Sequence, residues 1–181
     1  MKKIIVTNGL IAGAIVSSMF LISWPLMEKG IVNLENGMLF GYGSMLIAFS
    51  MIFFGVKKFR DRHQGGTITF GKAFQIGILI TVIASVMYAL SWEVCYHTIA
   101  TDFTEKYTAH HLDKMAKDGA TAAEIASKKA EMESFNEMYE NPFVRFAFTA
   151  GVEIFPVGLV ITLISAALFR KRGFLPETSN A

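Results

Sequence analysis

Four long runs without a charged residue limit what this chain can fold into more than any other feature. They are 24, 21, 20 and 16 residues long, and they cover residues 4–27, 36–56, 73–92 and 154–169. An α-helix rises ~1.5 Å per residue, so about 20 residues cross a hydrocarbon layer ~30 Å thick. The fourth run reaches this length when its helix begins near Pro142 and includes Arg145 and Glu153. The runs therefore predict four membrane-spanning segments, at about 4–27, 36–56, 73–95 and 143–169.

These segments are expected to be helices. Lipid cannot hydrogen-bond a bare backbone, so a spanning segment must satisfy its own N–H and C=O groups. A barrel strand would alternate apolar and polar residues, and the stretch from Met45 to Val56 does not alternate. We expect an all-α integral membrane bundle of four transmembrane helices. It would form a single membrane domain over residues 1–172, followed by a short cytoplasmic tail at 173–181.

The composition agrees with a membrane protein. Hydrophobic residues make up 52% of the 181 residues and charged residues 18%, whereas soluble domains carry about 25% charged residues. The single cysteine, Cys95, excludes an internal disulfide, and a net charge of +2 gives no reason to expect nucleic acid as a partner. Lys2 and Lys3 could begin a secretory signal, but the run after them is too long and no A-x-A-like site follows it. We expect an uncleaved first helix.

The charges between the runs alternate in sign. Basic residues dominate the N-terminus, the segment 57–72 and the C-terminus, whereas residues 93–141 hold ten acidic residues and five lysines. Because Lys and Arg concentrate in cytoplasmic loops, the pattern predicts that both termini are cytoplasmic. In a bacterium, the chain would be a multi-pass protein of the inner membrane with residues 93–141 on the outside.

Residues 101–141 predict an extracytoplasmic hairpin of two polar helices. Asp102 and Glu105 are placed to cap the first helix, and Gly119 ends it. Thr121 and Glu124 have the spacing of a capping box for the second helix. Asn141 and Pro142 end that helix and begin the fourth span. The narrow apolar stripes of the two helices consist of Phe103, Tyr107 and Met115 on the first, and Ile125, Met132, Phe135 and Tyr139 on the second. Two helices of this size bury too little surface to fold alone, so the stripes need a neighbour: the bundle itself, the headgroup layer or a partner protein.

Glu153 is the most informative polar residue, because it lies ~15 Å below the outer end of its helix. A carboxylate at that depth should face the bundle interior and find a partner, or be protonated. Arg145, Thr149 and Glu153 are spaced i, i+4 and i+8, so the Thr149 hydroxyl can donate to the carboxylate. Pro156 is expected to kink the helix close to this point. Two interpretations stay open: an ion or proton pathway, and a buried polar contact that fixes helix register.

A polar pocket is expected where the third and fourth spans meet on the outer side. Glu93 follows Trp92 at the end of the third span, and His97 comes one turn later. Both can lie near Arg145 and, with Glu153, would form a pocket that opens outward. The alternative is an ordinary interfacial belt of Trp, Tyr, Glu and His.

Two faces of small residues predict close helix packing, within one bundle or in a homo-oligomer. They are Gly9, Gly13 and Ser17 in the first span, and Gly77, Thr81 and Ser85 in the third.

We expect no metal site and no cofactor. His110 and His111 are adjacent, and adjacent side chains on a helix point about 100° apart. The glycines before Lys72 do not complete a phosphate-loop motif, because Ala73 follows the lysine.

Three stretches carry a resemblance to a known family. They are GGTITFGKAF at residues 65–74, the turn at Glu93, and EIFPVG at residues 153–158. In their order and spacing the chain resembles a bacterial membrane family catalogued as domain of unknown function 4199, from the first helix to about Arg172. The resemblance implies a small four-span protein of the bacterial inner membrane, and it implies no activity and no functional residues.

Three classes of function follow from these features. The first is a non-enzymatic accessory or assembly component with a membrane protein partner, favoured by the unpartnered stripes and by the lack of a catalytic constellation. The second is a small oligomeric carrier or proton-linked transporter that uses Glu153. The third is an intramembrane enzyme acting on lipid, for which only Glu93 with His97 approaches an acid/base pair.

Overall fold

The computed structural model describes residues 1–29, 31–33, 36–171 and 174–175, and these residues form helices and no strand. In chain order the elements are α1 (Lys2–Glu28), α2 (Gly37–His63), α3 (Phe70–Thr98), α4 (Phe103–Lys117), α5 (Ala122–Tyr139), α6 (Pro142–Phe148), the π-helical turn η1 (Thr149–Ile154) and α7 (Phe155–Phe169). Four helical units are long and apolar enough to cross a membrane: α1, α2, α3 and the unit made of α6, η1 and α7. The prediction of an all-α chain with four such helices is confirmed. Arg172 and most of the predicted tail, residues 173 and 176–181, lie outside the described residues.

The helices are longer than the uncharged runs. α2 continues beyond Val56 through a charged turn to His63, and α3 begins at Phe70 and ends at Thr98. Charge limits how far a segment can enter hydrocarbon, but it does not end a helix. The start of α3 is set instead by Thr69, whose hydroxyl accepts the backbone N–H of Lys72 at 3.3 Å.

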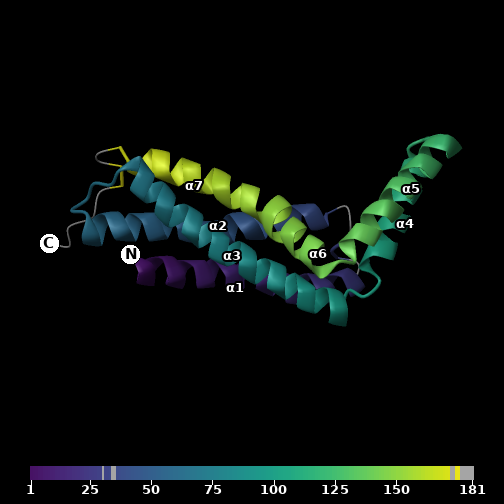
Figure 1. Ribbon diagram of the computed structural model, residues 1–181, viewed down its shortest axis with the longest axis horizontal. Helices are drawn as coiled ribbons and strands as arrows, with labels where there is room; N and C mark the ends of the chain where they lie inside the picture. Colours follow the sequence, from purple (N-terminus) through teal and green to yellow (C-terminus); the bar gives the residue numbers. More distant parts are fainter. Residues whose placement is uncertain (30, 34–35, 172–173, 176–181) are drawn as a thin grey trace.

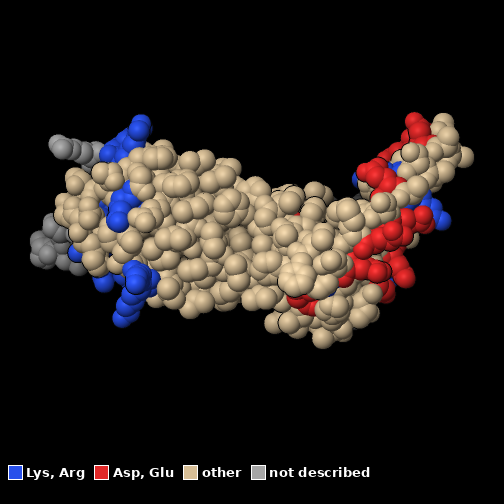
Figure 2. Space-filling view, viewed as in Figure 1, with Lys and Arg blue, Asp and Glu red and all other residues tan. Residues whose placement is uncertain are grey.

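α3 is the central helix of the bundle. It packs against α1, α2 and α7, and α2 also contacts α1 and α7 (Figure 1). The largest fully buried apolar side chains of the bundle come from several helices, among them Phe49 and Ile52 of α2, Ile76 and Ile80 of α3, and Phe169 of α7. Many large apolar side chains of these helices are exposed, and the middle of the bundle carries few charged residues on the face shown in Figure 2, as expected for a surface that faces lipid.

The small residues of the predicted packing faces lie at contacts between helices of this one chain. A Cβ atom at Gly13 would come within 2.8 Å of the Met87 Cβ atom, and one at Gly77 within 2.7 Å of Thr162 Cγ2. The hydroxyls of Thr81 and Thr162 are 3.3 Å apart, so α3 and α7 also share a buried hydrogen bond. Gly9 similarly faces Ile83, Ser17 donates to the Met87 carbonyl at 3.5 Å, and Ser85 is buried. These contacts pack α1 and α7 closely against different residues of α3.

A wide helical turn interrupts the fourth unit directly before Pro156. In η1 the backbone N–H of Phe155 donates to the carbonyl of Ala150, five residues earlier. Proline lacks an N–H group and its ring crowds the carbonyl four residues before it. The wide π-helical turn provides room for that ring. Pro156 lies in the first turn of α7, directly after this wide turn, so the irregular part of the helix is where the kink is expected.

α4 and α5 form the predicted helical hairpin. The capping box of Thr121 and Glu124 is present, and Gly119 adopts a left-handed φ of +86° after the end of α4. Asn141 accepts the backbone N–H of Phe143 at 3.0 Å and starts α6. The predicted cap at Asp102 is wrong: its side chain makes no capping hydrogen bond and pairs with Lys106 at 2.7 Å instead.

The hairpin projects from one end of the bundle. The start of α1 and the end of α7 lie together at the other end (Figure 1). Lys and Arg gather at that end, whereas Asp and Glu gather on the hairpin (Figure 2). Charge is thus separated along the long axis of the molecule.

Candidate functional site: a buried arginine cluster and an adjacent cleft

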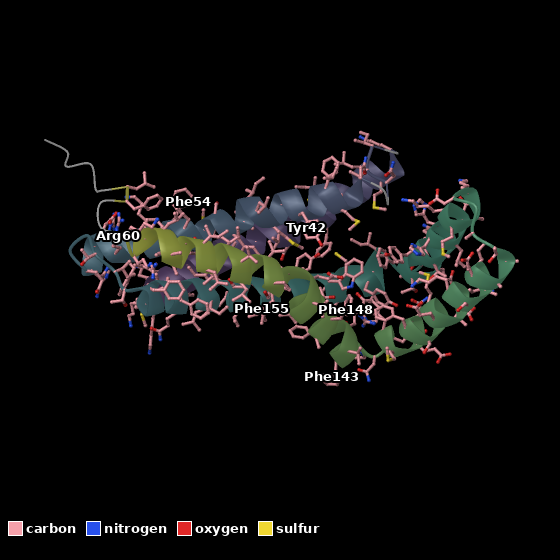
Figure 3. All side chains as sticks on the ribbon, turned by 90° about the horizontal axis from the view of Figure 1, so that it is seen from above. Tyr42, Phe54, Arg60, Phe143, Phe148 and Phe155 are labelled. Carbon is pink, nitrogen blue, oxygen red and sulfur yellow. The ribbon has the colours of Figure 1, made fainter. Side chains whose placement is uncertain are left out.

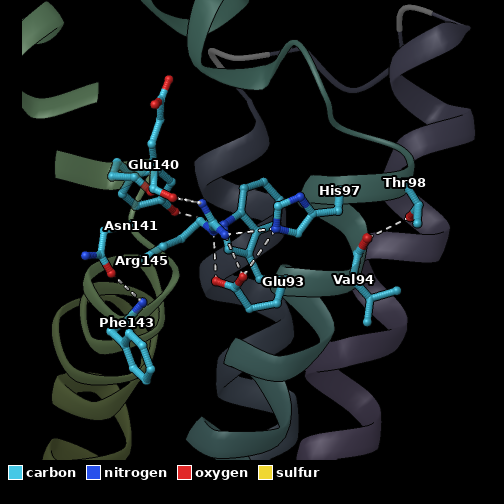
Figure 4. Close-up of polar contacts among 10 residues, drawn as sticks. Glu93, Val94, His97, Thr98, Glu140, Asn141, Phe143 and Arg145 are labelled. Atoms are coloured by element: carbon cyan, nitrogen blue, oxygen red, sulfur yellow. Dashed lines mark hydrogen bonds and ion pairs between the residues drawn. The ribbon is translucent and has the colours of Figure 1, made fainter. Parts of the chain in front are cut away.

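Arg145 is the centre of a polar cluster between α3, α5 and α6. It lies in the first turn of α6, and it is 1% exposed. Its Nε and Nη2 atoms donate to the two carboxylate oxygens of Glu93 at 2.8 and 2.6 Å, the paired geometry that makes such contacts strong. Its Nη1 donates to the carbonyls of Tyr139 and Glu140 at the end of α5, at 3.0 and 3.3 Å (Figure 4).

His97 completes the set of acceptors around Arg145. Its Nε2 atom lies 3.1 Å from Nη2 of Arg145 and 3.8 Å from the Glu93 carboxylate. Because a guanidinium can only donate, Nε2 accepts and the ring proton belongs on Nδ1. The five contacts to Glu93, Tyr139, Glu140 and His97 match the five N–H groups of a guanidinium. Arg145 therefore has no donor left over for a ligand.

Aromatic rings enclose the same guanidinium. Its central carbon lies 4.1 Å from the ring centroid of Tyr96 and 5.9 Å from that of Tyr139. Trp92 donates its indole N–H to the Tyr139 hydroxyl at 2.8 Å. Burial raises the pKa of the Tyr139 phenol, which keeps it neutral. The cluster thus ties the end of the hairpin to α3.

Glu153 lies apart from this cluster. The structure brings Glu93, His97 and Arg145 together, but Glu153 makes no hydrogen bond or ion pair with any described residue, Thr149 included. The i, i+4, i+8 argument assumed a regular α-helix. The π-helical turn between Arg145 and Glu153 changes the register, and the guanidinium turns toward α3 and α5.

Glu153 instead lines a cleft of about 370 Å³ between the hairpin and the end of the bundle. Its walls come from α4, α5, α6 and η1, and five of the lining residues are aromatic: Phe103, Tyr107, Phe135, Tyr139 and Phe148. Four of these and Met132 belong to the predicted stripes, whereas the stripe residues Met115 and Ile125 do not line the cleft. Phe148 was not predicted, although the phenylalanine-rich stretch after Pro142 was a signal for it. Figure 3 shows Phe148 where the bundle meets the hairpin.

A second buried arginine, Arg60, lies at the other end of the bundle. It is 2% exposed, pairs with Asp61 at 2.6 Å, and donates to the carbonyls of Phe174 and Leu175 at 2.5 and 2.7 Å. Its guanidinium carbon lies 5.0 Å from the ring centroid of Phe169. Sequence reasoning counted Arg60 only as one of the basic residues of its segment. The structure gives it a packing role that joins α2 to the chain after α7.

Comparison with known proteins places the chain in one family. No curated protein and no solved structure matches it. A family model described as a protein of unknown function, DUF4199, matches residues 7–171. This range contains all the residues of the arginine cluster and of the cleft, and it is nearly the whole chain. The chain belongs to the DUF4199 family of proteins of unknown function.

Proposed function

We propose that this protein is a non-enzymatic accessory or assembly component of the bacterial inner membrane. The hairpin carries the proposal: it projects beyond the bundle, and Tyr139 at its base is the one described residue of α4 and α5 that is buried. A projecting hairpin with a fixed base and free sides is suited to binding a partner protein. The saturated Arg145 cluster supplies the fixed base.

The same residues are less suited to catalysis than to holding the hairpin. Glu93 and His97 were the nearest approach to an acid/base pair, but both carboxylate oxygens of Glu93 accept from Arg145. His97 Nε2, the nitrogen nearest to Glu93, accepts from the same guanidinium. A general base needs a lone pair free to reach a substrate proton. In this arrangement the described groups hold the hairpin in place.

The proposal includes an orientation in which both termini are cytoplasmic and the hairpin is periplasmic. The separation of charge in Figure 2 supports it, because Lys and Arg mark the cytoplasmic side. Alkaline phosphatase and green fluorescent protein, each fused after residue 120 and after residue 181, test it. We expect phosphatase activity only at residue 120 and fluorescence only at residue 181. The same reporter active at both positions would overturn the orientation.

Site-specific photo-crosslinking in living cells tests the partner role. A photoreactive residue at Lys114 of α4 or Glu133 of α5 should capture one protein species in stoichiometric yield at native expression. The same residue at Leu21, which is exposed on the apolar surface of α1, is the matched control and should capture lipid. Hairpin positions that give no more protein adduct than Leu21 would refute an accessory role.

A proton-linked carrier is a second candidate, because Glu153 is a carboxylate without an ion-pair partner among the described residues. Such a carrier would have to be oligomeric, since four spans are few for a transport path. Proteoliposome flux tests it with Glu153→Gln. Flux and pH dependence that are unchanged in this variant would remove the candidate.

A further inference from the structure

The cleft between the hairpin and the bundle combines one unpaired carboxylate with aromatic walls. Phe135, Tyr139 and Phe148 form one wall, in which the ring centroids lie 5.4 to 6.0 Å apart. Phe103 and Tyr107, with centroids 5.8 Å apart, contribute from α4. Aromatic faces carry partial negative charge and attract cations.

The remaining charges of the cleft leave Glu153 uncompensated. Lys128 and Glu131 also line it, but they pair with each other at 2.9 Å and cancel. His111 stacks on Tyr107, with ring centroids 6.3 Å apart. Arg145, the cation on the same helical unit, is fully used by the cluster described above. Glu153 is therefore the acidic side chain of the cleft that no described side chain pairs with, and a bound cation would be the partner that keeps it ionised.

This combination selects one class of ligand. The carboxylate of Glu153 would repel an anion. A purely apolar molecule would bury that carboxylate without giving it a counter-charge. A metal ion needs several oxygen, nitrogen or sulfur ligands, and the described part of the chain has no group of three or more His, Cys, Asp or Glu side chains placed to hold one. An ammonium group on carbon satisfies both features, because its charge meets the carboxylate and its substituents pack on the rings. The volume of about 370 Å³ is within the ~300–1,000 Å³ of small-molecule sites.

We propose that this cleft binds an organic ammonium ion, with the nitrogen against Glu153 and its carbon substituents against Phe103, Phe135 and Phe148. The same chemistry is present in a free amine and in an ethanolamine lipid headgroup. This inference does not depend on the partner role of the hairpin. It gives the one unpaired carboxylate of the cleft a function as the anchor of a ligand.

Titration calorimetry with tetraethylammonium tests the proposal on the full chain in phosphatidylglycerol nanodiscs. Sodium chloride of the same ionic strength is the reference. We expect saturable binding by the native protein, and an affinity at least about tenfold lower in Glu153→Gln. Glu133→Gln removes the same charge from an exposed part of α5 outside the cleft and should leave the affinity unchanged. Glu153→Gln removes no hydrogen bond or ion pair, so it is expected to fold.

A second variant tests the aromatic wall without touching the charge. Phe135→Leu keeps an apolar side chain but removes a ring face, and should weaken tetraethylammonium binding about threefold. Saturable binding that is unaffected by Glu153→Gln, or no saturable binding by the native protein, would overturn the proposal. Nanodiscs with phosphatidylethanolamine distinguish the two sources of the ligand. Weaker tetraethylammonium binding there supports a lipid headgroup as the natural occupant, and equal binding supports a free amine.

Discussion

Replacing Arg145 should detach the hairpin from the bundle at a large cost in stability. Arg145→Met keeps a long apolar side chain but removes five hydrogen bonds, including the pair to Glu93 at 2.6 and 2.8 Å. Arg145 is 1% exposed and the Glu93 side chain 20%, so the variant leaves a largely buried carboxylate without its partner. Breaking a buried pair from one side costs ~3–5 kcal/mol. Because Glu93 keeps some access to water, we expect about 3 kcal/mol.

The measurement is the free energy of unfolding of the purified protein in mixed micelles, followed by tryptophan fluorescence. The free energy of unfolding of Arg145→Lys should lie between those of the native protein and Arg145→Met. An ammonium retains the charge but cannot make the paired contact with Glu93. Lys129→Met is the matched control. It removes a cation from an ion pair of 3.7 Å on the exposed side of α5, and should change stability by less than about 1 kcal/mol.

A double-mutant cycle separates the ion pair from the rest of the cluster. Adding Glu93→Gln to Arg145→Met removes the unpaired carboxylate, so the double variant should be more stable than the sum of the two single changes predicts. An Arg145→Met protein that loses less than 1 kcal/mol, or two changes that simply add, would refute the view that this pair anchors the hairpin.

Two further predictions concern packing and pH. Gly158→Val should lower the free energy of unfolding by ~1–3 kcal/mol, because a Cβ atom there would overlap Thr81 Cγ2. Gly71 has open space around it, so the control Gly71→Ala should be neutral or slightly stabilising. The backbone N–H and the hydroxyl of Thr121 lower the pKa of Glu124 below its usual range. The capping box therefore stabilises the start of α5 fully at a pH above the unfolded-state pKa of Glu124. This stabilisation is lost as the pH falls through the lower, folded-state pKa. Amide hydrogen exchange in the first turn of α5 should accelerate over that acidic range. Thr121→Ala removes the hydroxyl but keeps the backbone N–H, so it should weaken this pH dependence. Protection that is flat across the range in the native protein would contradict the prediction.

The parts of the fold that depend on local sequence could be predicted. Uncharged runs located the four helices that are long and apolar enough to cross a membrane, because the cost of charge in hydrocarbon acts on each residue separately. The capping box at Thr121 and the left-handed Gly119 follow from three or four neighbouring residues. Asp102 was predicted wrongly because a lysine one turn later, Lys106, competes for the same carboxylate.

The candidate site depends on geometry that the sequence does not display. A π-helical turn moves Glu153 out of line with Arg145, and Pro156 marks an irregular helix without showing that the irregularity is an inserted residue. The cleft requires two hairpin helices and the start of the fourth unit to be placed in space. The buried position of Arg60 depends on carbonyls more than one hundred residues away.

The two carboxylates in the half of the bundle nearest the hairpin, Glu93 and Glu153, bear on the two interpretations of Glu153. A polar contact that fixes register acts through a partner, as Glu93 does with Arg145 at 2.6 Å. Glu153 has no such partner among the described residues, and the register of the adjacent helices is already set by close packing at Gly77 and by the bonded hydroxyls of Thr81 and Thr162. Replacing Glu153 by Gln should therefore cost little stability. Its carboxylate is better explained as a group kept available for a cation than as part of the framework.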